Sequence, residues 1–312
     1  MQKATALKTR RPPLSLSLSW RPAPFELFAI TTVLLTYGLI VLGGAVRATD
    51  SGTACPDWPL CHGQVIPRWD GHVLVEYSHR LAASIVGLLI FATAIWAWRR
   101  RRSDRLVGVT AGAAVVLLIV QVIAGAAAVN TETEASVVAL HLSIALTLFA
   151  TLIVLTIASL RRESATARFP LLPAVVALGA FALIISGAYV SQEGAGLVYP
   201  DWPLFDGKLV SSGGKLADLH YAHRLLAGVL GILVLALVLH TRGERRPAIL
   251  LAVGLAFVLY AAQVLVGASN IWFELATPLR ISHLALASAL WGVLVFAAAW
   301  SYLRPEASQE PP

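Results

Sequence analysis

The chain has 312 residues, of which 57% are hydrophobic and only 13% are charged. Soluble domains carry about 25% charged residues, so this composition excludes an ordinary soluble protein and indicates a membrane protein. The net charge of +7 is scattered over short loops instead of forming one patch, which argues against a nucleic-acid partner.

Eight apolar stretches are long enough to cross a lipid bilayer. A span needs about 20 mostly apolar residues at a rise of ~1.5 Å each. Because lipid offers backbone groups no hydrogen-bonding partner, we predict an all-α membrane protein with eight transmembrane helices. In chain order the predicted spans are 25–46, 77–98, 106–128, 137–159, 170–190, 220–240, 248–268 and 279–302.

The lysines and arginines predict the orientation of the chain. Most of the 24 fall in the tails, residues 1–24 and 303–312, and in the second, fourth and sixth loops. The positive-inside rule then places both termini in the cytoplasm of a multi-pass membrane protein, for which we favour a bacterial inner membrane. Residues 1–24 are also basic, serine-rich and free of acids, as an organellar transit peptide is. We favour a cytoplasmic tail because the segment is short and lacks an amphipathic face.

Two motifs occur twice with the same offset. The segment Pro-Asp-Trp-Pro-Leu at 56–60 recurs at 200–204, and His-Arg-Leu at 79–81 recurs at 223–225, each 144 residues later. Four crossings return a chain to its starting side, so the two copies should have the same orientation. We therefore predict two parallel four-helix-bundle repeats, residues 25–160 and 170–302, related by a pseudo-two-fold axis along the membrane normal.

Four histidines lie at matching places in the two repeats. His79 and His223 belong to the repeated motif, and His141 and His283 form a second pair with an offset of 142. Each lies near the outer end of an even-numbered span, so all four should share one depth. Ionisable residues within a span indicate function, and two imidazoles from facing helices can hold one heme iron from opposite sides. We predict that His79 pairs with His141, and His223 with His283.

Helix bonding and zinc binding account for these four histidines less well than heme ligation does. A buried histidine can simply bond one helix to another, but four at one depth in a duplicated pattern favour ligation. A zinc site needs three or four ligands that converge tightly, which the spacing does not offer. For the remaining histidines and a repeated glutamine we expect solvated outer positions for His62, His72 and His220, a cytoplasmic helix end for His240, and close helix packing for Gln121 and Gln263.

The two repeats differ at one carboxylate. Glu76 precedes His79 by three residues on the same helix face, whereas its counterpart is His220. A carboxylate beside a heme ligand can donate or accept a proton in catalysis. An acid at the start of a helix can equally meet the positive end of the helix dipole. Position alone leaves both roles of Glu76 open.

The only two cysteines bracket the first Pro-Asp-Trp-Pro-Leu motif. Cys55 and Cys61 share one loop on the outer, oxidising side, which predicts a disulfide bond. The bond could be a structural staple or a redox pair beside the chemistry, and the spacing does not decide between them.

An arginine follows the first histidine of each repeat. Arginine pairs well with carboxylates, and heme carries two propionates. Arg80 and Arg224 are therefore predicted to pair with heme propionates.

Together these residues resemble the heme A synthase family of cytochrome oxidase assembly, and the resemblance covers about residues 25–302. Its motifs are specific in combination with the eight-helix duplication. They are Gly-Gly-Ala-Val-Arg at 43–47, the segment 55–61, Glu-Tyr-Ser-His-Arg at 76–80, His141, residues 200–204, Tyr-Ala-His-Arg at 221–224, and His283.

The resemblance implies an oxidoreductase that converts the C8 methyl group of heme O to a formyl group, giving heme A for cytochrome oxidase assembly. It implies a resident heme b in the second half and a substrate heme in the first half. This chain lacks the second cysteine pair that some members carry. The implied residue roles are heme b ligands at His223 and His283, substrate heme ligands at His79 and His141, an essential carboxylate at Glu76 and loop cysteines at Cys55 and Cys61.

The implied partners are the heme O substrate and the lipid bilayer. A heme O synthase (protoheme farnesyltransferase), an electron acceptor or donor, and a second copy of the chain are further partners that the residues leave open. The main alternative is a diheme b-type electron-transfer cytochrome that modifies nothing and has no need of Glu76. A transporter built from parallel repeats fits less well, because it does not explain histidines at one depth.

Overall fold

The structure is a computed structural model that describes residues 23–68, 70–160, 170–211 and 213–303. Within these ranges the chain forms eight long helices and two short 3-10 turns, η1 (Ala195–Leu197) and η2 (Thr241–Gly243). The helices are α1 (Pro24–Ala48), α2 (Gly71–Arg100), α3 (Arg105–Asn130), α4 (Ala135–Leu160), α5 (Leu171–Gln192), α6 (Lys215–His240), α7 (Pro247–Trp272) and α8 (Thr277–Leu303).

All eight helices are long and apolar enough to cross a membrane. The chain is a multi-pass membrane protein, and the prediction of an all-α fold with eight spans is confirmed. The predicted tails, residues 1–24 and 303–312, lie almost wholly outside the described residues, so the choice between a cytoplasmic tail and a transit peptide lies there too.

Two helices begin five or six residues earlier than the sequence predicted. Helix α2 begins at Gly71 instead of residue 77, and α6 begins at Lys215 instead of residue 220. The side chain of Asp70 caps α2 by accepting a hydrogen bond from the backbone N–H of Val73 at 3.2 Å. The added first turns are partly polar, so they fall outside a pattern based on apolar runs. His79 consequently lies well inside α2, as its ninth residue.

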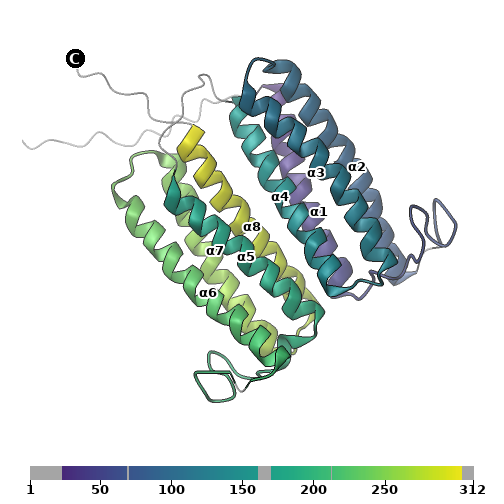
Figure 1. The fold of residues 1–312 in the computed structure, drawn as a ribbon, viewed down its shortest axis with the longest axis vertical. Coiled ribbons are helices and arrows are strands. Elements are labelled where there is room, and N and C mark those ends of the chain that lie inside the picture. Colours follow the sequence, from purple (N-terminus) through teal and green to yellow (C-terminus); the bar gives the residue numbers. More distant parts are fainter. Residues whose placement is uncertain (1–22, 69, 161–169, 212, 304–312) are drawn as a thin grey trace, which may run out of the picture.

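The first four helices and the last four form two bundles that lie side by side (Figure 1). Helices α1, α4, α5 and α8 make the contacts between the bundles. Glycine permits the close approach there, because a Cβ placed on Gly44 of α1 would lie 2.6 Å from Cδ2 of Leu284 in α8. A Cβ on Gly292 of α8 would lie 2.7 Å from Cε1 of Phe149 in α4. The pseudo-two-fold axis between the bundles stays a prediction.

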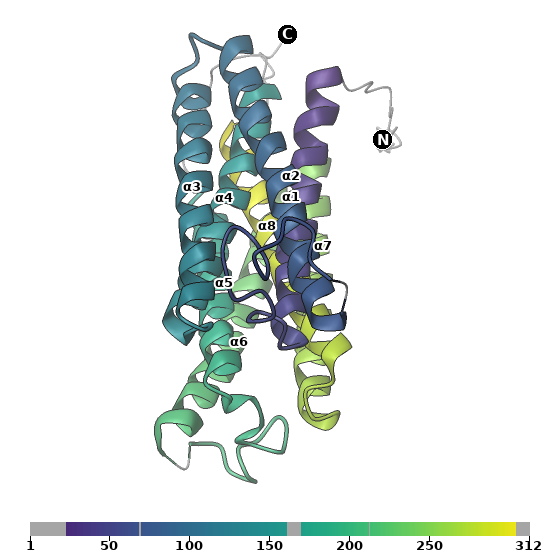
Figure 2. The same ribbon diagram turned by 90° about the vertical axis from the view of Figure 1, so that its right-hand side faces the viewer.

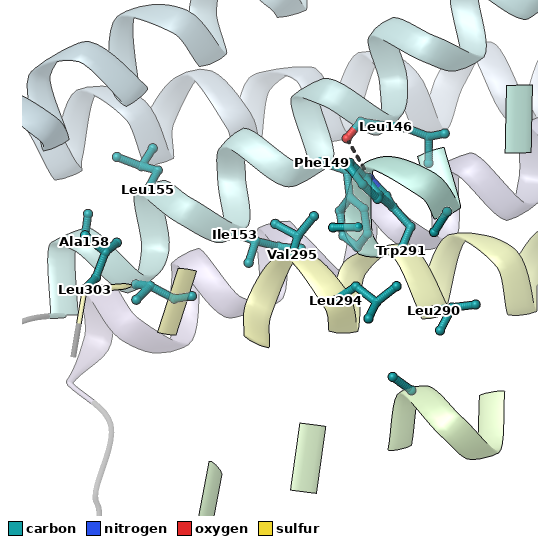
Figure 3. Packing of buried hydrophobic residues seen from close by; sticks show 14 of the residues in the cluster. Leu146, Phe149, Ile153, Leu155, Ala158, Leu290, Trp291, Leu294, Val295 and Leu303 are labelled. Atoms are coloured by element: carbon teal, nitrogen blue, oxygen red, sulfur yellow. Dashed lines mark hydrogen bonds between the residues drawn. The ribbon is translucent and has the colours of Figure 1, made fainter. Parts of the chain in front are cut away.

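The core between the bundles is apolar, and the indole N–H within it has a hydrogen-bond acceptor (Figure 3). Trp291 of α8 packs near Phe149, and its indole N–H donates to the backbone carbonyl of Leu146 at 3.3 Å. An indole N–H in lipid-like surroundings without an acceptor would be costly, so this bond lets tryptophan fill the interface. Leu155 and Leu294 of the same cluster are fully buried. The bundles therefore form one continuous body.

The two long loops leave the same end of the molecule, opposite the end at which α1 begins and α8 ends (Figures 1 and 2). The loop after α1 covers residues 49–70, and the loop after α5 covers residues 193–214. Both are shorter than predicted because α2 and α6 extend into them. Each loop lies at the helix ends nearest the four candidate histidines.

Candidate functional site

Each candidate histidine packs against a glycine of the preceding helix. A Cβ on any of these four glycines would lie 2.9 to 3.1 Å from the Cε1 atom of the histidine ring. This is closer than side chains normally approach, so glycine makes room for the imidazole. The pairs are His79 with Gly43, His141 with Gly125, His223 with Gly187 and His283 with Gly267.

The four imidazoles line one cavity of about 1310 Å³ that reaches through both bundles. Its wall also includes Glu76 and is otherwise largely apolar. Within each half the two imidazoles are close enough to interact electrostatically, His79 with His141 and His223 with His283. The structure thus brings together the histidines that the sequence paired, while their ligation of iron stays a prediction.

The rings present one nitrogen to the cavity and bury the other. Nδ1 of His79, His141 and His283 is buried with no hydrogen-bond partner among the described residues. Nδ1 of His223 lies 2.8 Å from the hydroxyl oxygen of Ser186. Since the rings line the cavity, Nε2 is the nitrogen that a metal in the cavity would meet. Two Nε2 atoms from facing helices are the donor set of a bis-histidine heme.

A glutamine lies beside one of these cavity-facing nitrogens. Nε2 of Gln121 is 3.3 Å from Nε2 of His141. The expectation that Gln121 serves close helix packing is therefore incomplete, because its amide group also contacts the imidazole of His141. Its counterpart Gln263 also lines the cavity.

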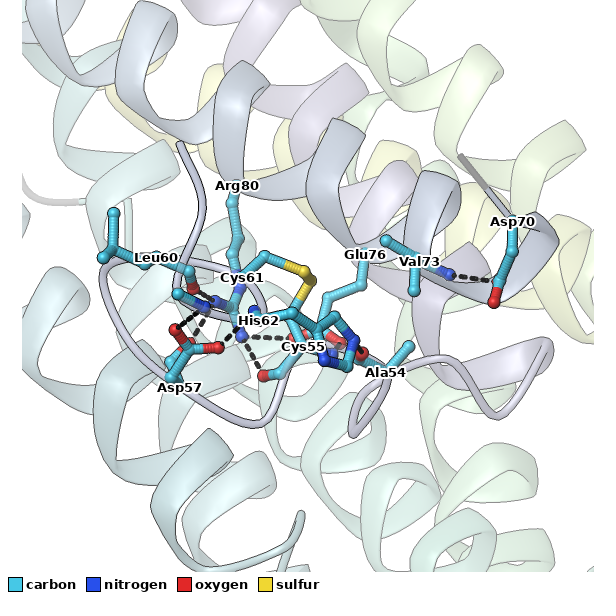
Figure 4. The surroundings of a disulfide bond; sticks show 11 residues. Ala54, Cys55, Asp57, Leu60, Cys61, His62, Asp70, Val73, Glu76 and Arg80 are labelled. Carbon is cyan, nitrogen blue, oxygen red and sulfur yellow. Dashed lines mark hydrogen bonds and ion pairs between the residues drawn. A yellow bond between two sulfur atoms is a disulfide. The ribbon is translucent and has the colours of Figure 1, made fainter. Parts of the chain in front are cut away.

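Glu76 is anchored through both carboxylate oxygens (Figure 4). Its side chain is almost fully buried, with the residue 3% exposed. One oxygen accepts a hydrogen bond from the backbone N–H of Cys55 at 2.7 Å, and the other pairs with the Arg80 guanidinium at 2.5 Å. Because α2 begins at Gly71, Glu76 lies beyond the first turn. The helix-dipole role, which needs an acid at the helix start, is therefore wrong.

Arg80 holds the first long loop, and Arg224 holds the second, through equivalent hydrogen bonds to backbone carbonyls. Arg80 donates to the backbone carbonyls of Asp57, Leu60 and Cys55 at 2.6 to 2.8 Å. Arg224 makes the equivalent bonds 144 residues later, to the carbonyls of Asp201, Leu204 and Tyr199 at 2.8 to 3.2 Å. Both arginines also line the cavity. Their pairing with heme propionates stays a prediction.

The expectation that His220 is solvated is wrong. His220 is 5% exposed, and its Nε2 accepts a hydrogen bond from Nε of Arg224 at 3.0 Å. The reason is the early start of α6, which places His220 inside the helix and beneath the loop, against the ring of Tyr199. His62 and His72 are exposed, as predicted, and His240 is the last residue of α6.

Cys55 and Cys61 form the predicted disulfide bond (Figure 4). Both residues are buried, at 0% and 1% exposure, and pack against Val73 of α2. In the second half the same places are filled by Tyr199 and Phe205, whose rings meet edge to face with centroids 5.2 Å apart. Thiol–disulfide exchange requires access to a sulfur, so burial favours a structural staple over a redox pair.

Removing the disulfide is expected to loosen the first long loop without removing the heme that is predicted for the second half. In the chain-entropy account, a bond across six residues contributes on the order of 2 kcal/mol. The double variant Cys55→Ser, Cys61→Ser should therefore lose amide hydrogen-exchange protection in residues 55–64 and keep the heme that is predicted for the second half. Loss of heme modification with unchanged loop protection would instead favour the redox role.

An aspartate organises the turn of each long loop. Asp57 accepts hydrogen bonds from the backbone N–H groups of His62 and Gly63 at 2.6 and 2.8 Å. Asp201 accepts from those of Asp206 and Gly207 at 2.7 and 2.9 Å. These bonds, led by that of the glycine in each loop, hold the pKa of both carboxyl groups below the usual value of 3.8. Each bond favours the ionised form.

Acid is therefore expected to release both turns. The folded pKa is lower than the unfolded one, so the stabilising effect is fully present above pH 3.8 and is lost as pH falls through the folded pKa. Hydrogen-exchange protection of the amides of His62 and Gly63 should hold at about pH 5 and be lost as the pH is lowered below 3.8. The variant Asp57→Asn should remove this pH dependence in the first loop and leave that of Asp201 unchanged.

Positive charge dominates the polar part of the cavity wall. Among the described residues that line it, the arginines outnumber the carboxylates: Arg47, Arg80, Arg224 and Arg280 against Asp50 and Glu76. Arg280 of α8 donates to the backbone carbonyls of Ala48 and Arg47, at 2.9 and 3.3 Å, and so ties the end of α1 to the second half. A largely apolar cavity with imidazoles and excess arginine fits a heme with its two carboxylates.

Comparison with known proteins gives the chain its family. The family model of cytochrome oxidase assembly proteins, COX15-CtaA, matches residues 26–74 and 70–295. The chain belongs to this family. The heme A synthase of Alkalihalophilus pseudofirmus is 31% identical over 281 residues, which cover 86% of this chain and 95% of that protein. The heme A synthase of Symbiobacterium thermophilum is 32% identical over 284 residues, covering 86% and 92%. That of Geobacillus kaustophilus is 30% identical over 295 residues, covering 90% of each.

Membership of the COX15-CtaA family confirms the resemblance drawn from the motifs. The seating of the histidines by glycines was nevertheless not predicted, although Gly43 belongs to the motif at 43–47. Their signal was available, because Gly43 and Gly187 are 144 residues apart and Gly125 and Gly267 are 142 apart, the offsets of the histidines themselves. Ser186 left no such signal, because the repeat has a leucine in its place.

Proposed function

We propose that this protein is a heme A synthase, which oxidises the C8 methyl group of heme O to a formyl group. One observation carries the proposal: a single cavity holds two imidazole pairs, and among the described residues only the first pair has a buried carboxylate on its helices. The relatives named above are heme A synthases at about 30% identity over most of their length, which supports the same activity.

The two halves would divide the work. His223 and His283 would hold heme b, which when bound supplies one-electron transfer. His79 and His141 would receive heme O as substrate, since Glu76 lies on the same helix as His79. The exposed apolar side chains that cover the membrane-facing helices would let the long isoprenoid tail of heme O lie toward lipid.

Glu76 would move protons for the reaction. Conversion of a methyl to a formyl group with oxygen from water releases four electrons and four protons. The electrons require an acceptor outside the chain, and the protons require a base near the substrate. Glu76 is on the cavity wall, and its bonds to Arg80 and to the N–H of Cys55 fix where its oxygens lie. A fixed position within reach of the reacting group is the first requirement of a general base.

The surroundings of the enzyme follow from the same proposal. Both termini would be cytoplasmic in a bacterial inner membrane, with the long loops on the outer side. Heme O would arrive from a heme O synthase through the bilayer, and an electron acceptor would complete the reaction. Association of two copies would place two such cavities in one assembly.

Co-expression with a heme O synthase tests the activity. Hemes extracted from the cells should include heme A or its hydroxylated precursor only when this protein is present. The control is the same host with the heme O synthase alone. Heme O that persists unchanged, beside a purified protein with a bis-histidine heme spectrum, would identify a diheme electron carrier instead.

A further inference from the structure

One of the four histidines is tied to a side chain that its counterpart lacks. Nδ1 of His223 lies 2.8 Å from Oγ of Ser186 in α5. The same hydroxyl donates its proton to the backbone carbonyl of Leu183 at 2.8 Å. Ser186 directly precedes Gly187, the glycine that seats the His223 ring. Orientation and hydrogen bonding of this imidazole are thus set by two consecutive residues.

This bond determines which nitrogen of His223 carries the proton. A serine hydroxyl has one proton, and that of Ser186 is committed to the carbonyl of Leu183. Its oxygen can therefore only accept, so Nδ1 of His223 is the donor. Nε2 is then left with a free lone pair toward the cavity, which is the form that binds a metal. Hydrogen bonding to the far nitrogen also raises the basicity of a histidine ligand.

The first half has no such arrangement. The residue 144 positions before Ser186 is Leu42, which cannot accept a hydrogen bond. Nδ1 of His79 is accordingly buried with no partner among the described residues. The second ligand position of that half is also encumbered, because Gln121 lies 3.3 Å from the cavity-facing Nε2 of His141. Iron would have to displace that amide.

We propose that Ser186 is a positioning residue that makes the second-half pocket retain its heme, whereas the first-half pocket, with Leu42 in its place, exchanges heme. The inference rests on the proposed function and adds to it a reason for the different fates of two similar pockets. An enzyme that modifies heme must release one heme and keep the other. Here the hydroxyl group of Ser186 contributes to that difference.

The test measures heme release from the purified full-length protein in lipid nanodiscs. Excess apomyoglobin serves as the heme acceptor, and the bis-histidine absorption band reports what remains. Ser186→Ala should speed release of the second-half heme about 10- to 100-fold and shift its midpoint potential upward, since the loss of such a partner costs that much in metal affinity. Ser186→Thr keeps the hydroxyl and should restore slow release.

Two further variants make the test specific. Leu42→Ser supplies the missing acceptor to the first half and should slow release of heme bound there. Ser282→Ala is the matched control, since Ser282 directly precedes His283 but its hydroxyl bonds only to the backbone carbonyl of Pro278. It should leave release and potential unchanged.

The outcomes separate the inference from the proposed function. Unchanged heme release and midpoint potential in Ser186→Ala would overturn the role of Ser186, even if the protein makes heme A. A wild-type protein that binds no heme in either half would instead overturn the proposed function. Poor folding of Ser186→Ala leaves the decision to Leu42→Ser, where release as fast as in the wild type would also contradict the inference.

Discussion

Gly187→Ala is expected to empty the second-half heme pocket although all four histidines remain. The added Cβ would lie 2.9 Å from Cε1 of His223, so the ring must turn or the helices must part. Overpacking of this kind costs about 1–3 kcal/mol, which corresponds to a loss of roughly 5- to 150-fold in heme affinity. The measurement is the heme-to-protein ratio after purification, together with heme titration of the apoprotein.

A second glycine of the same helix provides the control. A Cβ on Gly179 would meet Leu230 and Leu233 at 3.6 Å, an ordinary contact, so Gly179→Ala should leave heme content unchanged. Equal heme loss in the two variants would show that α5 tolerates no added methyl group anywhere. Retained heme in Gly187→Ala would show that His223 is not held in the position described.

Glu76→Gln is expected to stop heme modification while both pockets still bind heme. Glutamine can still accept the hydrogen bond from the N–H of Cys55, but it cannot exchange a proton or form the ion pair with Arg80. General acid–base groups contribute about 100- to 10,000-fold to a rate. The expected result is accumulation of heme O in the co-expression assay, with heme content of the purified protein close to that of the wild type.

The second half offers the matched variant for this experiment. His220 takes the place of Glu76 there and receives a hydrogen bond from Arg224, as Glu76 pairs with Arg80. His220→Gln should disturb the second loop similarly and leave heme A formation largely intact. If His220→Gln abolished the activity as completely as Glu76→Gln, the carboxylate would matter for loop structure and not for proton transfer.

The sequence predicted the parts of the molecule that repeat. Identical offsets located the histidines and the loops, and long apolar runs located the eight helices. The start of α6 was missed because Lys215 and Asp218 in its first turn are charged and lie outside the apolar run that marks the span. The role of Arg80 in holding the first loop was not predicted because its acceptors are backbone carbonyls, which every sequence contains. Contacts to the backbone leave no compositional trace.

The bonds that Arg80 makes to the first loop also determine which segments can be exchanged between the halves. Arg80 directly follows His79, and it bonds to the loop that holds Cys55 and to Glu76. The first loop, Glu76 and His79 are therefore linked through Arg80, so that none of them can be transferred to the second half without the others. A graft of residues 55–61 into the second half would meet His220 where the N–H of Cys55 needs a carboxylate. An exchange of residues 55–80 as a block would carry every partner with it, so the smallest transferable unit of this chemistry is the loop together with the first turns of its helix.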